Sequence, residues 1–404
     1  MRTGVLSSAD LRMSQNLYLF AYILFVTKHM FGSSYIIPWP DMVDSISNAV
    51  FVGVILIKLA FQRYSITQLL GIGIVAVFCA YSSINARYYS PLFSFFLLIS
   101  LQDVDLRSIM RGSYRWKIMI VLVHVLCYIA LLVCSPDSVT YLYREDEVRH
   151  FFLLGHPNMF SAYVVWICIE FVYVNYERIH RPQLVFILII NMGCYYFTDS
   201  RTGLYMSITM LALIFLEKYF VPIFRAIVRP IAKYGFGICA IACMLLTTIY
   251  TPAISDGARK IWNALNNMLT GRLVFGAYAY YEYGFTWFGR TLNAPPKVFY
   301  NGHWLDGVIF DIAYQWLFIV YGSVFIVIIC VAFFLTADRM ENIEKLIVVV
   351  YVLYALMENY IVNAAMCFPV LLIGMYMYMK SRPLVESPGI IKEGNIPLWK
   401  RGSA

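Results

Sequence analysis

Arginine recurs in three short polar clusters that interrupt an otherwise apolar chain. Arg201 lies in Asp-Ser-Arg-Thr-Gly, Arg272 in Thr-Gly-Arg and Arg290 in Gly-Arg-Thr. A guanidinium group stays charged at physiological pH, and its planar fork binds phosphate oxygens through two parallel hydrogen bonds. These three arginines are therefore candidate ligands for a phosphate or diphosphate group.

Two polar clusters come directly before apolar stretches that predict helices. His156, Pro157 and Asn158 precede one stretch, and proline is favoured in the first turn of a helix because its missing N–H costs nothing there. Ser200 precedes the other, where its hydroxyl is suited to cap the helix. Such helix starts attract anions, so His156, Asn158 and Ser200 are further candidate substrate-binding residues. The simpler alternative is that they only cap helices and that Arg201 extends to water.

His303 and Asp306 lie in Asn-Gly-His-Trp-Leu-Asp-Gly, just before another apolar stretch. On a helical turn, their three-residue spacing would bring both side chains to one side. Either group could take a proton from a hydroxyl, so both are candidate catalytic bases. The structural alternative is that Asp306 merely caps the next helix.

Asp103 and Asp105 form an Asp-x-Asp pair, a metal and nucleotide-sugar motif of many soluble glycosyltransferases. The pair lies in a short loop with no room for a nucleotide-binding βαβ unit, so we interpret it as a solvated acidic pair. The sequence also has no phosphate-binding glycine loop and no Cys/His metal spacing. We therefore expect no metal and no cofactor.

The elements that position these residues lie in a membrane. The 404 residues are 61% hydrophobic and 13% charged, about half the charged share of ordinary soluble domains. The apolar residues come in blocks long enough to cross a hydrocarbon core of roughly 30 Å as helices. We predict an all-α polytopic membrane protein that forms one transmembrane domain over residues 1–400. Its about twelve predicted spans are 17–37, 42–60, 67–83, 88–102, 118–134, 156–174, 183–197, 203–217, 234–250, 312–335, 346–357 and 362–379.

The positive charges orient the chain. With both termini cytoplasmic, 21 of the 31 Lys and Arg residues fall in cytoplasmic segments, as is typical of membrane proteins. The net charge of +8 therefore signals topology, and we expect no nucleic-acid partner. All the candidate site residues then lie at the outer face. Residues 251–311 form a long extracytoplasmic loop rich in Trp and Tyr, which we expect to be structured and either to rest at the interface or to bind substrate.

Lys28 and His29 lie inside the first predicted span, where ionisable side chains are costly and usually face a partner or a cavity. A structural ion pair with Glu170 or Glu358 is one explanation. A role in a transport or substrate pathway is the other.

The order of the polar clusters resembles a known family. His-Pro-Asn-x-Phe at 156–160, Ser-Arg-Thr-Gly at 200–203 and Gly-Arg at 271–272 are followed by a long loop and by Leu-Asp and Tyr-Gln-Trp-Leu-Phe-x-x-Tyr-Gly within 305–322. This pattern resembles the bacterial O-antigen and capsular polysaccharide polymerases (Wzy-type), in the superfamily that includes the O-antigen ligases. The family often has Asp-Asn before the tenth span, whereas Gly307 follows Asp306 here.

The resemblance implies a glycosyltransferase of the bacterial cytoplasmic (inner) membrane, acting in O-antigen, capsule or exopolysaccharide biosynthesis. It would transfer a growing glycan from undecaprenyl diphosphate to a fresh lipid-linked repeat unit at the outer face of the bilayer. Arginines and helix ends would hold the diphosphate leaving group without a metal. A flippase and a chain-length regulator of the same pathway are the partner proteins that the resemblance implies.

Other functions stay open. An O-antigen ligase would share the fold and the arginines but use a lipopolysaccharide core as acceptor. A polysaccharide flippase or secondary transporter would need charged residues along a pathway and an inverted repeat. A polyprenyl-monophosphate sugar transferase would carry essential acids in its first outer loop, where Asp41 and Asp44 are the only candidates.

Overall fold

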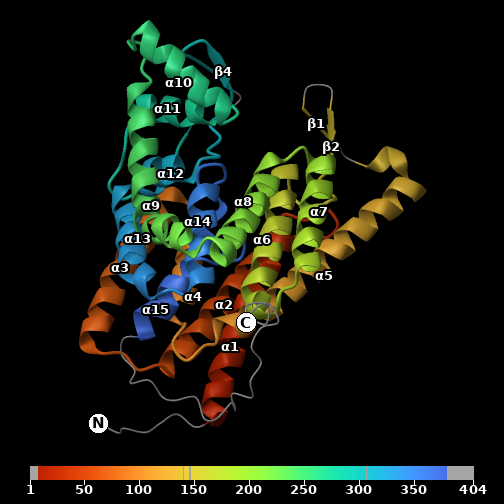
Figure 1. Ribbon diagram of the computed structural model, residues 1–404, viewed down its shortest axis with the longest axis vertical. Coiled ribbons are helices and arrows are strands. Elements are labelled where there is room, and N and C mark those ends of the chain that lie inside the picture. Colours follow the sequence, from red (N-terminus) through yellow and green to blue (C-terminus); the bar gives the residue numbers. More distant parts are fainter. Residues whose placement is uncertain (1–7, 140, 145–146, 294, 306, 380–404) are drawn as a thin grey trace.

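The protein is helical through most of its length. The computed structural model describes residues 8–139, 141–144, 147–293, 295–305 and 307–379 (Figure 1). The longer helices are α1 Ser8–Phe31, α2 Asp41–Ala60, α3 Ile66–Ala86, α4 Ser90–Ile99, α5 Leu106–Cys134, α6 Pro157–Asn175, α7 Arg181–Thr198, α8 Arg201–Tyr219, α9 Val221–Ile249, α10 Asp256–Met268, α11 Arg272–Tyr283, α13 Ser323–Thr336, α14 Asn342–Tyr354 and α15 Val370–Met379. The short α12 is Ala313–Trp316, and the antiparallel hairpins are β1 Leu142–Arg144 with β2 Glu147–Arg149 and β3 Val298–Tyr300 with β4 His303–Leu305. The predicted helical class is confirmed.

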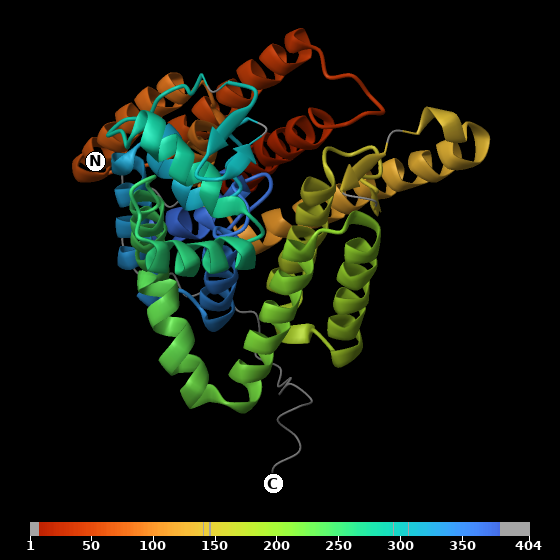
Figure 2. The same ribbon diagram turned by 90° about the horizontal axis from the view of Figure 1, so that it is seen from above.

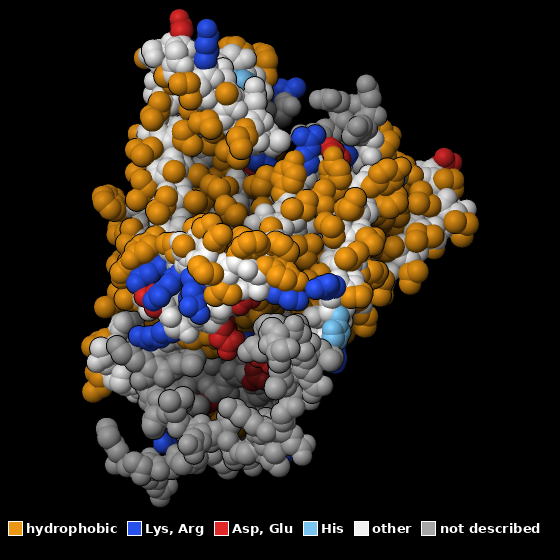
Figure 3. All heavy atoms as spheres, in the orientation of Figure 1, with side chains coloured by type: hydrophobic (Ala, Val, Ile, Leu, Met, Phe, Trp, Pro, Cys, Tyr) orange, Lys and Arg blue, Asp and Glu red, His pale blue; other side chains and the backbone are white. Residues whose placement is uncertain are grey.

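Five helical stretches among the described residues are long and apolar enough to cross a membrane. They are α2, α3, α5, α9 and α6 extended to Arg178. In α2, α3 and α5 only 17–22% of the most apolar stretch is buried inside the protein, so apolar side chains cover much of the outer surface (Figure 3). Soluble proteins rarely expose apolar patches of that extent, whereas lipid covers them at no cost. The fold is that of a membrane-embedded protein, and the number of twelve spans stays a prediction.

A band of Lys and Arg side chains crosses the face seen in Figure 3 below the broad apolar surface. Arg225 and Arg229 belong to the exposed residues near the start of α9, and Lys218 lies in the last turn of α8. The first turns of α9 are therefore basic and amphipathic, which is why this helix begins before the predicted span 234–250. In the same way α5 begins before the predicted span 118–134, because Arg107, Arg111 and Arg115 belong to its first turns.

The predicted span 312–335 is broken at Gly322. Its φ of 98° is left-handed, and a Cβ there would lie 2.4 Å from the carbonyl oxygen of Trp287. The segment 286–290 packs into the break, where the N–H of Ser323 donates to the carbonyl of Thr286 at 2.8 Å. The backbone N–H groups that the break frees therefore find hydrogen-bond acceptors within the protein. Backbone polar groups need such partners inside a membrane, where water does not reach them.

The last two predicted spans, 346–357 and 362–379, are shortened in the structure. Between α14 and α15 the chain forms buried irregular backbone and a short 3-10 turn over residues 355–369. Its polar groups find partners on other helices: the Tyr22 hydroxyl donates to the carbonyl of Ala364 at 2.8 Å, and the Ser94 hydroxyl accepts from its N–H at 2.9 Å. α14 lies between α8 and α9, which diverge from their junction (Figures 1 and 2).

The described residues of the segment 251–311 fold into a structured unit, here called the cap, at one end of the molecule (Figure 1). It contains α10, α11 and the β3–β4 hairpin, so the expectation that this segment is structured is confirmed. Its centre is aromatic: the rings of Tyr250 and Trp262 stack 3.4 Å apart, and Tyr300 packs against Tyr278. The β1–β2 hairpin and the N-terminal ends of α6 and α8 lie toward the same end, while α1 begins at the opposite end.

Candidate substrate-binding site at the cap end

The N-terminal turns of α6 and α8 lie against each other. Gly203 in α8 approaches α6 so closely that a Cβ would lie 2.4 Å from the Ser161 hydroxyl oxygen. His156 is the N-cap of α6, and its Nδ1 accepts from the N–H of Asn158 at 3.3 Å. Ser200 is the N-cap of α8, but it is buried and its side chain makes no capping bond. The two helix starts that supplied candidate binding residues are therefore neighbours in the structure.

Arg149 ties these helix ends together. Its Nε donates to the carbonyl of Thr198 at 2.8 Å, and its Nη2 donates to Oδ1 of Asn158 at 2.7 Å. The residue is 8% exposed and belongs to β2. Burial and the nearby Arg149 charge lower the pKa of His156, which favours the neutral imidazole. The side chain of Asn158 is occupied by its hydrogen bond with Arg149 in this structure.

Arg201 stands apart from this bonded network. It begins α8, its side chain is exposed, and it forms no hydrogen bond or ion pair with any residue that the structure describes. A guanidinium at a helix start, with its donors unoccupied, is suited to bind an anion. Among the described residues, Arg272 and Arg290 donate to protein acceptors, whereas the N–H groups of Arg201 have no such acceptor.

Arg272 is fully engaged in an ion cluster. Its Nε lies 3.1 Å from Oδ2 of Asp311, its Nη2 lies 3.2 Å from Oε1 of Glu358, and its Nη1 donates to the carbonyl of Met357. The same Glu358 oxygen accepts from the Thr202 hydroxyl at 3.1 Å. This cluster, here called the Arg272 cluster, joins the Ser-Arg-Thr-Gly and Gly-Arg sequences in space.

The Arg272 cluster carries no excess positive charge. Burial raises the pKa of Glu358 to about 7, with Arg272 lowering it and Asp311 raising it. Burial also raises the pKa of Asp311, again against the effect of Arg272. One cation therefore faces two carboxyl groups, of which Glu358 is partly protonated near neutral pH. Arg272 is placed to orient carboxylates, a different role from the predicted diphosphate ligand.

Arg290 also binds protein groups. Its Nη1 donates to the carbonyl of Tyr283, and its Nη2 donates to the carbonyl of Phe285 at 3.3 Å. These carbonyls lie at and beyond the last turn of α11, where backbone acceptors lack partners within the helix. Arg290 therefore caps the C-terminal end of α11.

His303 lies in strand β4, not on a helix. Side chains alternate along a strand, so the helical argument for bringing residues 303 and 306 together does not hold. The side chain of His303 is half-buried and makes no hydrogen bond with a described residue. Asp306, the other predicted base, lies outside the described residues.

The ionisable residues of the helices form pairs that differ from the expected ones. Lys28 lies 3.2 Å from Asp44 and also donates to Asn48. Lys117 pairs with Glu170, and Ser113 donates to the same carboxylate at 2.8 Å. Lys28 therefore forms a structural ion pair, one of the two explanations considered, but its partner is Asp44 on the neighbouring α2 and not Glu170 or Glu358.

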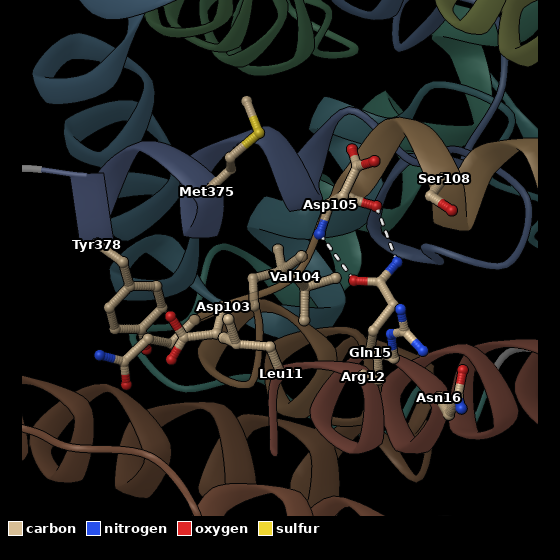
Figure 4. Close-up of a pocket in the computed structure, with 12 residues that line it drawn as sticks. Leu11, Arg12, Gln15, Asn16, Asp103, Val104, Asp105, Ser108, Met375 and Tyr378 are labelled. Atoms are coloured by element: carbon tan, nitrogen blue, oxygen red, sulfur yellow. Dashed lines mark hydrogen bonds between the residues drawn. The ribbon is translucent and has the colours of Figure 1, made fainter. Parts of the chain in front are cut away.

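The Asp103-Val104-Asp105 sequence borders a hollow of about 670 Å³ between α1, α15 and the start of α5 (Figure 4). Asp105 caps α5 by accepting from the N–H of Arg107 at 3.1 Å, and its own N–H donates to Oε1 of Gln15 at 2.8 Å. Asp105 is exposed, and these contacts give it a structural role at the start of α5.

Within the described ranges, no group of three or more His, Cys, Asp and Glu side chains is placed to hold a metal ion. No protein-family model, no curated protein and no solved structure matches this chain. A function is therefore inferred from the site and from the sequence resemblance.

Sequence reasoning did not single out Arg149, Asp311 or Glu358 as site residues. The sequence did indicate that Arg149 has a specific role, because basic residues are rare in the predicted outer loops. A signal also existed for Glu358, because acidic residues beside membrane spans are costly and usually have a partner. The partners themselves come from distant segments, which the sequence does not pair.

Proposed function

We propose that the protein is a polysaccharide polymerase that joins undecaprenyl-diphosphate-linked repeat units at the outer face of the bacterial cytoplasmic membrane. The observation that carries the proposal is the hydrogen-bonded link from Thr202 through Glu358 to Arg272. Two motifs that resemble the Wzy-type family in their order along the chain also meet in space. They do so beside the helix start that presents the exposed Arg201.

In this proposal the cap end faces outward and the basic band near the α8–α9 junction faces the cytoplasm. Both termini are cytoplasmic, and the chain crosses the membrane about twelve times. The Lys/Arg asymmetry of the sequence supports this orientation. The position of the cap, with α6 and α8 beginning toward it, supports a site open to the outer leaflet.

The donor diphosphate would bind at the adjoining N-termini of α6 and α8. Arg201 supplies an exposed guanidinium there, and Arg149 holds the two helix ends in place. Charge develops on the diphosphate as it leaves the sugar, and fixed cations and helix dipoles stabilise such charge without a metal or a general acid. His156 and Ser200 are the N-cap residues of the two helices, and Asn158 accepts the hydrogen bond that holds Arg149 beside them.

The acceptor would be a second lipid-linked repeat unit whose sugar approaches from the cap. His303 and Asp306 stay predicted bases, and exposed aromatic side chains of the cap, such as Trp304, offer faces for sugar stacking. A flippase that delivers repeat units and a regulator of chain length are the protein partners that this reaction requires.

The proposal is tested by purifying the protein from its source membranes and identifying co-purifying lipids by mass spectrometry. We expect undecaprenyl diphosphate carrying an oligosaccharide. Incubation with lipid-linked repeat units from a strain that lacks the chain should then yield a ladder of longer lipid-linked glycans. Transfer to a lipopolysaccharide core, without such a ladder, would indicate a ligase instead. If neither product forms and no such lipid is bound, the proposal is wrong.

A transporter is the second candidate, because the described part of the chain contains a span broken at Gly322 and buried irregular backbone between α14 and α15. The breaks at Gly322 and at residues 355–369 resemble the discontinuous helices that line substrate sites in transporters. Buried ion pairs such as Lys117 with Glu170 also occur in the helical region. Uptake of lipid-linked repeat units into the inner leaflet of proteoliposomes, without glycan elongation, would favour this function over polymerisation.

A further inference from the structure

Asp311 is the most accessible carboxylate of the Arg272 cluster. Its side chain is 32% exposed, against 11% for Arg272 and 4% for Glu358. It lies at the end of the cap, directly before α12, and one oxygen is fixed by Arg272 at 3.1 Å. A carboxylate that is held in place yet reachable from solvent has the geometry that a proton acceptor needs.

The other members of the cluster are placed to hold this carboxylate. Arg272 directs its three nitrogen atoms at Asp311, Glu358 and the carbonyl of Met357. Glu358 is anchored on its far side by the Thr202 hydroxyl. The groups that face Asp311 are therefore Arg272 from α11 and, from the buried segment 355–369, Glu358 and Tyr360.

We propose that Asp311 is the general base that accepts the proton of the acceptor sugar hydroxyl, and that Arg272 and Glu358 position it. This inference rests on the proposed polymerase function and names the residue that performs its proton transfer. It differs from the sequence prediction, which placed the base at residue 303 or 306.

In the transfer step, the acceptor hydroxyl gives its proton to the Asp311 carboxylate while its oxygen forms a bond to the anomeric carbon of the donor sugar. The bond from that carbon to the diphosphate oxygen breaks, and the electron pair leaves with undecaprenyl diphosphate, which Arg201 receives. The protonated Asp311 then returns its proton to water. The products are a longer lipid-linked glycan and free undecaprenyl diphosphate.

The ionisation of Asp311 suits this task. Burial raises its pKa, which strengthens it as a base, while Arg272 keeps the ionised form available. The base must be ionised to act, so kcat/KM should rise as the pH increases through its pKa. The negative charge of ionised Asp311 in turn raises the pKa of Glu358.

The test uses the full-length protein in nanodiscs, with undecaprenyl diphosphate as the binding probe and extracted lipid-linked repeat units as substrates. Asp311→Asn should slow transfer by about 10²- to 10⁴-fold, the usual effect of losing a general base, while binding stays close to the wild-type value. Asp338→Asn is the matched control: this aspartate is likewise a partly exposed carboxylate held in ion pairs, here with Arg229 and Lys233 near the basic band. It should leave both measurements unchanged.

Arg272→Gln tests the positioning role. Arg272 lowers the pKa of Asp311, so removing its charge should move the acid limb of the kcat/KM profile to higher pH. A residue that only supports the fold would lower the rate without moving that limb. If Asp311→Asn fails to fold, the shift in Arg272→Gln decides the question, and an unmoved limb overturns the inference.

The outcomes separate the inference from the function on which it rests. If the wild-type protein neither binds undecaprenyl diphosphate nor elongates glycans, the polymerase proposal fails and the inference falls with it. If the wild-type protein elongates glycans and Asp311→Asn does so at a similar rate, only the inference is overturned. Loss of lipid binding in parallel with transfer in Asp311→Asn also overturns the role as base.

Discussion

Gly203 and Ser161 lie at a close contact between α8 and α6, where a Cβ on the glycine would stand 2.4 Å from the serine hydroxyl oxygen. The contact fixes how two helix N-termini adjoin at the cap end. It also explains the glycine of the Ser-Arg-Thr-Gly sequence, which reasoning from sequence assigned only to a motif. A larger residue there would push the two helix starts apart.

Gly203→Ala should therefore destabilise the protein by about 1–3 kcal/mol, the usual effect of overpacking a tight contact. It should also reduce activity, because Arg201 would be displaced. Thermal unfolding of the detergent-solubilised protein measures the first effect. Gly193→Ala in α7 is the control: no atom of the described residues lies within 4 Å of the place that its Cβ would take, so its melting temperature should not fall. Equal melting temperatures for the two variants would contradict the tight contact.

The arginines at 201 and 290 should respond to substitution in opposite ways. Arg201→Ala should abolish or strongly reduce glycan elongation with an unchanged melting temperature, because the exposed side chain has no partner among the described residues. Arg290→Ala should lower stability by about 1–3 kcal/mol, because it leaves the carbonyls of Tyr283 and Phe285 without a donor. Elongation assays and melting curves on both variants check this. A fully active Arg201→Ala would remove Arg201 from the site.

The buried pair of Lys117 and Glu170 should show strong coupling. The two side chains are 1% and 0% exposed, so removing one charge leaves the other buried without compensation. Lys117→Met should cost about 3–5 kcal/mol, whereas Lys117→Met combined with Glu170→Gln should recover most of that loss. Unfolding of the two single variants and the double variant measures the coupling. Additive losses would show that the pair is not needed in its ionised form.

The proposed orientation can be measured by labelling single cysteines in a background where the nine native cysteines are replaced. Ser255 and Lys260 are exposed residues of the cap, and Arg178 and His180 are exposed in the turn between α6 and α7. Cysteines at 255 and 260 should react with an impermeant thiol reagent on intact cells. Those at 178 and 180 should react only after lysis, and the reverse pattern would overturn both the topology and the site.

Much of this protein is determined by local sequence. Long apolar blocks, with basic residues on the predicted cytoplasmic side, predicted a helical membrane protein. A helix forms its backbone hydrogen bonds within itself, so it can lie in lipid with apolar side chains on its surface. The start of α6 was predictable from Pro157, since the first turn of a helix depends on neighbours within a few residues. The aromatic content of the cap likewise indicated a folded segment.

The tertiary structure alone decided which side chains meet. The three predicted arginines look alike in sequence but differ in the structure. Arg201 is exposed, Arg272 pairs with two carboxylates, and Arg290 donates to carbonyls at the C-terminal end of α11. The sequence could not separate them, because the partners of Arg272 come from distant segments. The breaks at Gly322 and at 355–369 have the same origin: other parts of the chain supply the hydrogen bonds that a continuous helix would make for itself. Helices follow from periodicity and composition, whereas a site follows from how those helices pack.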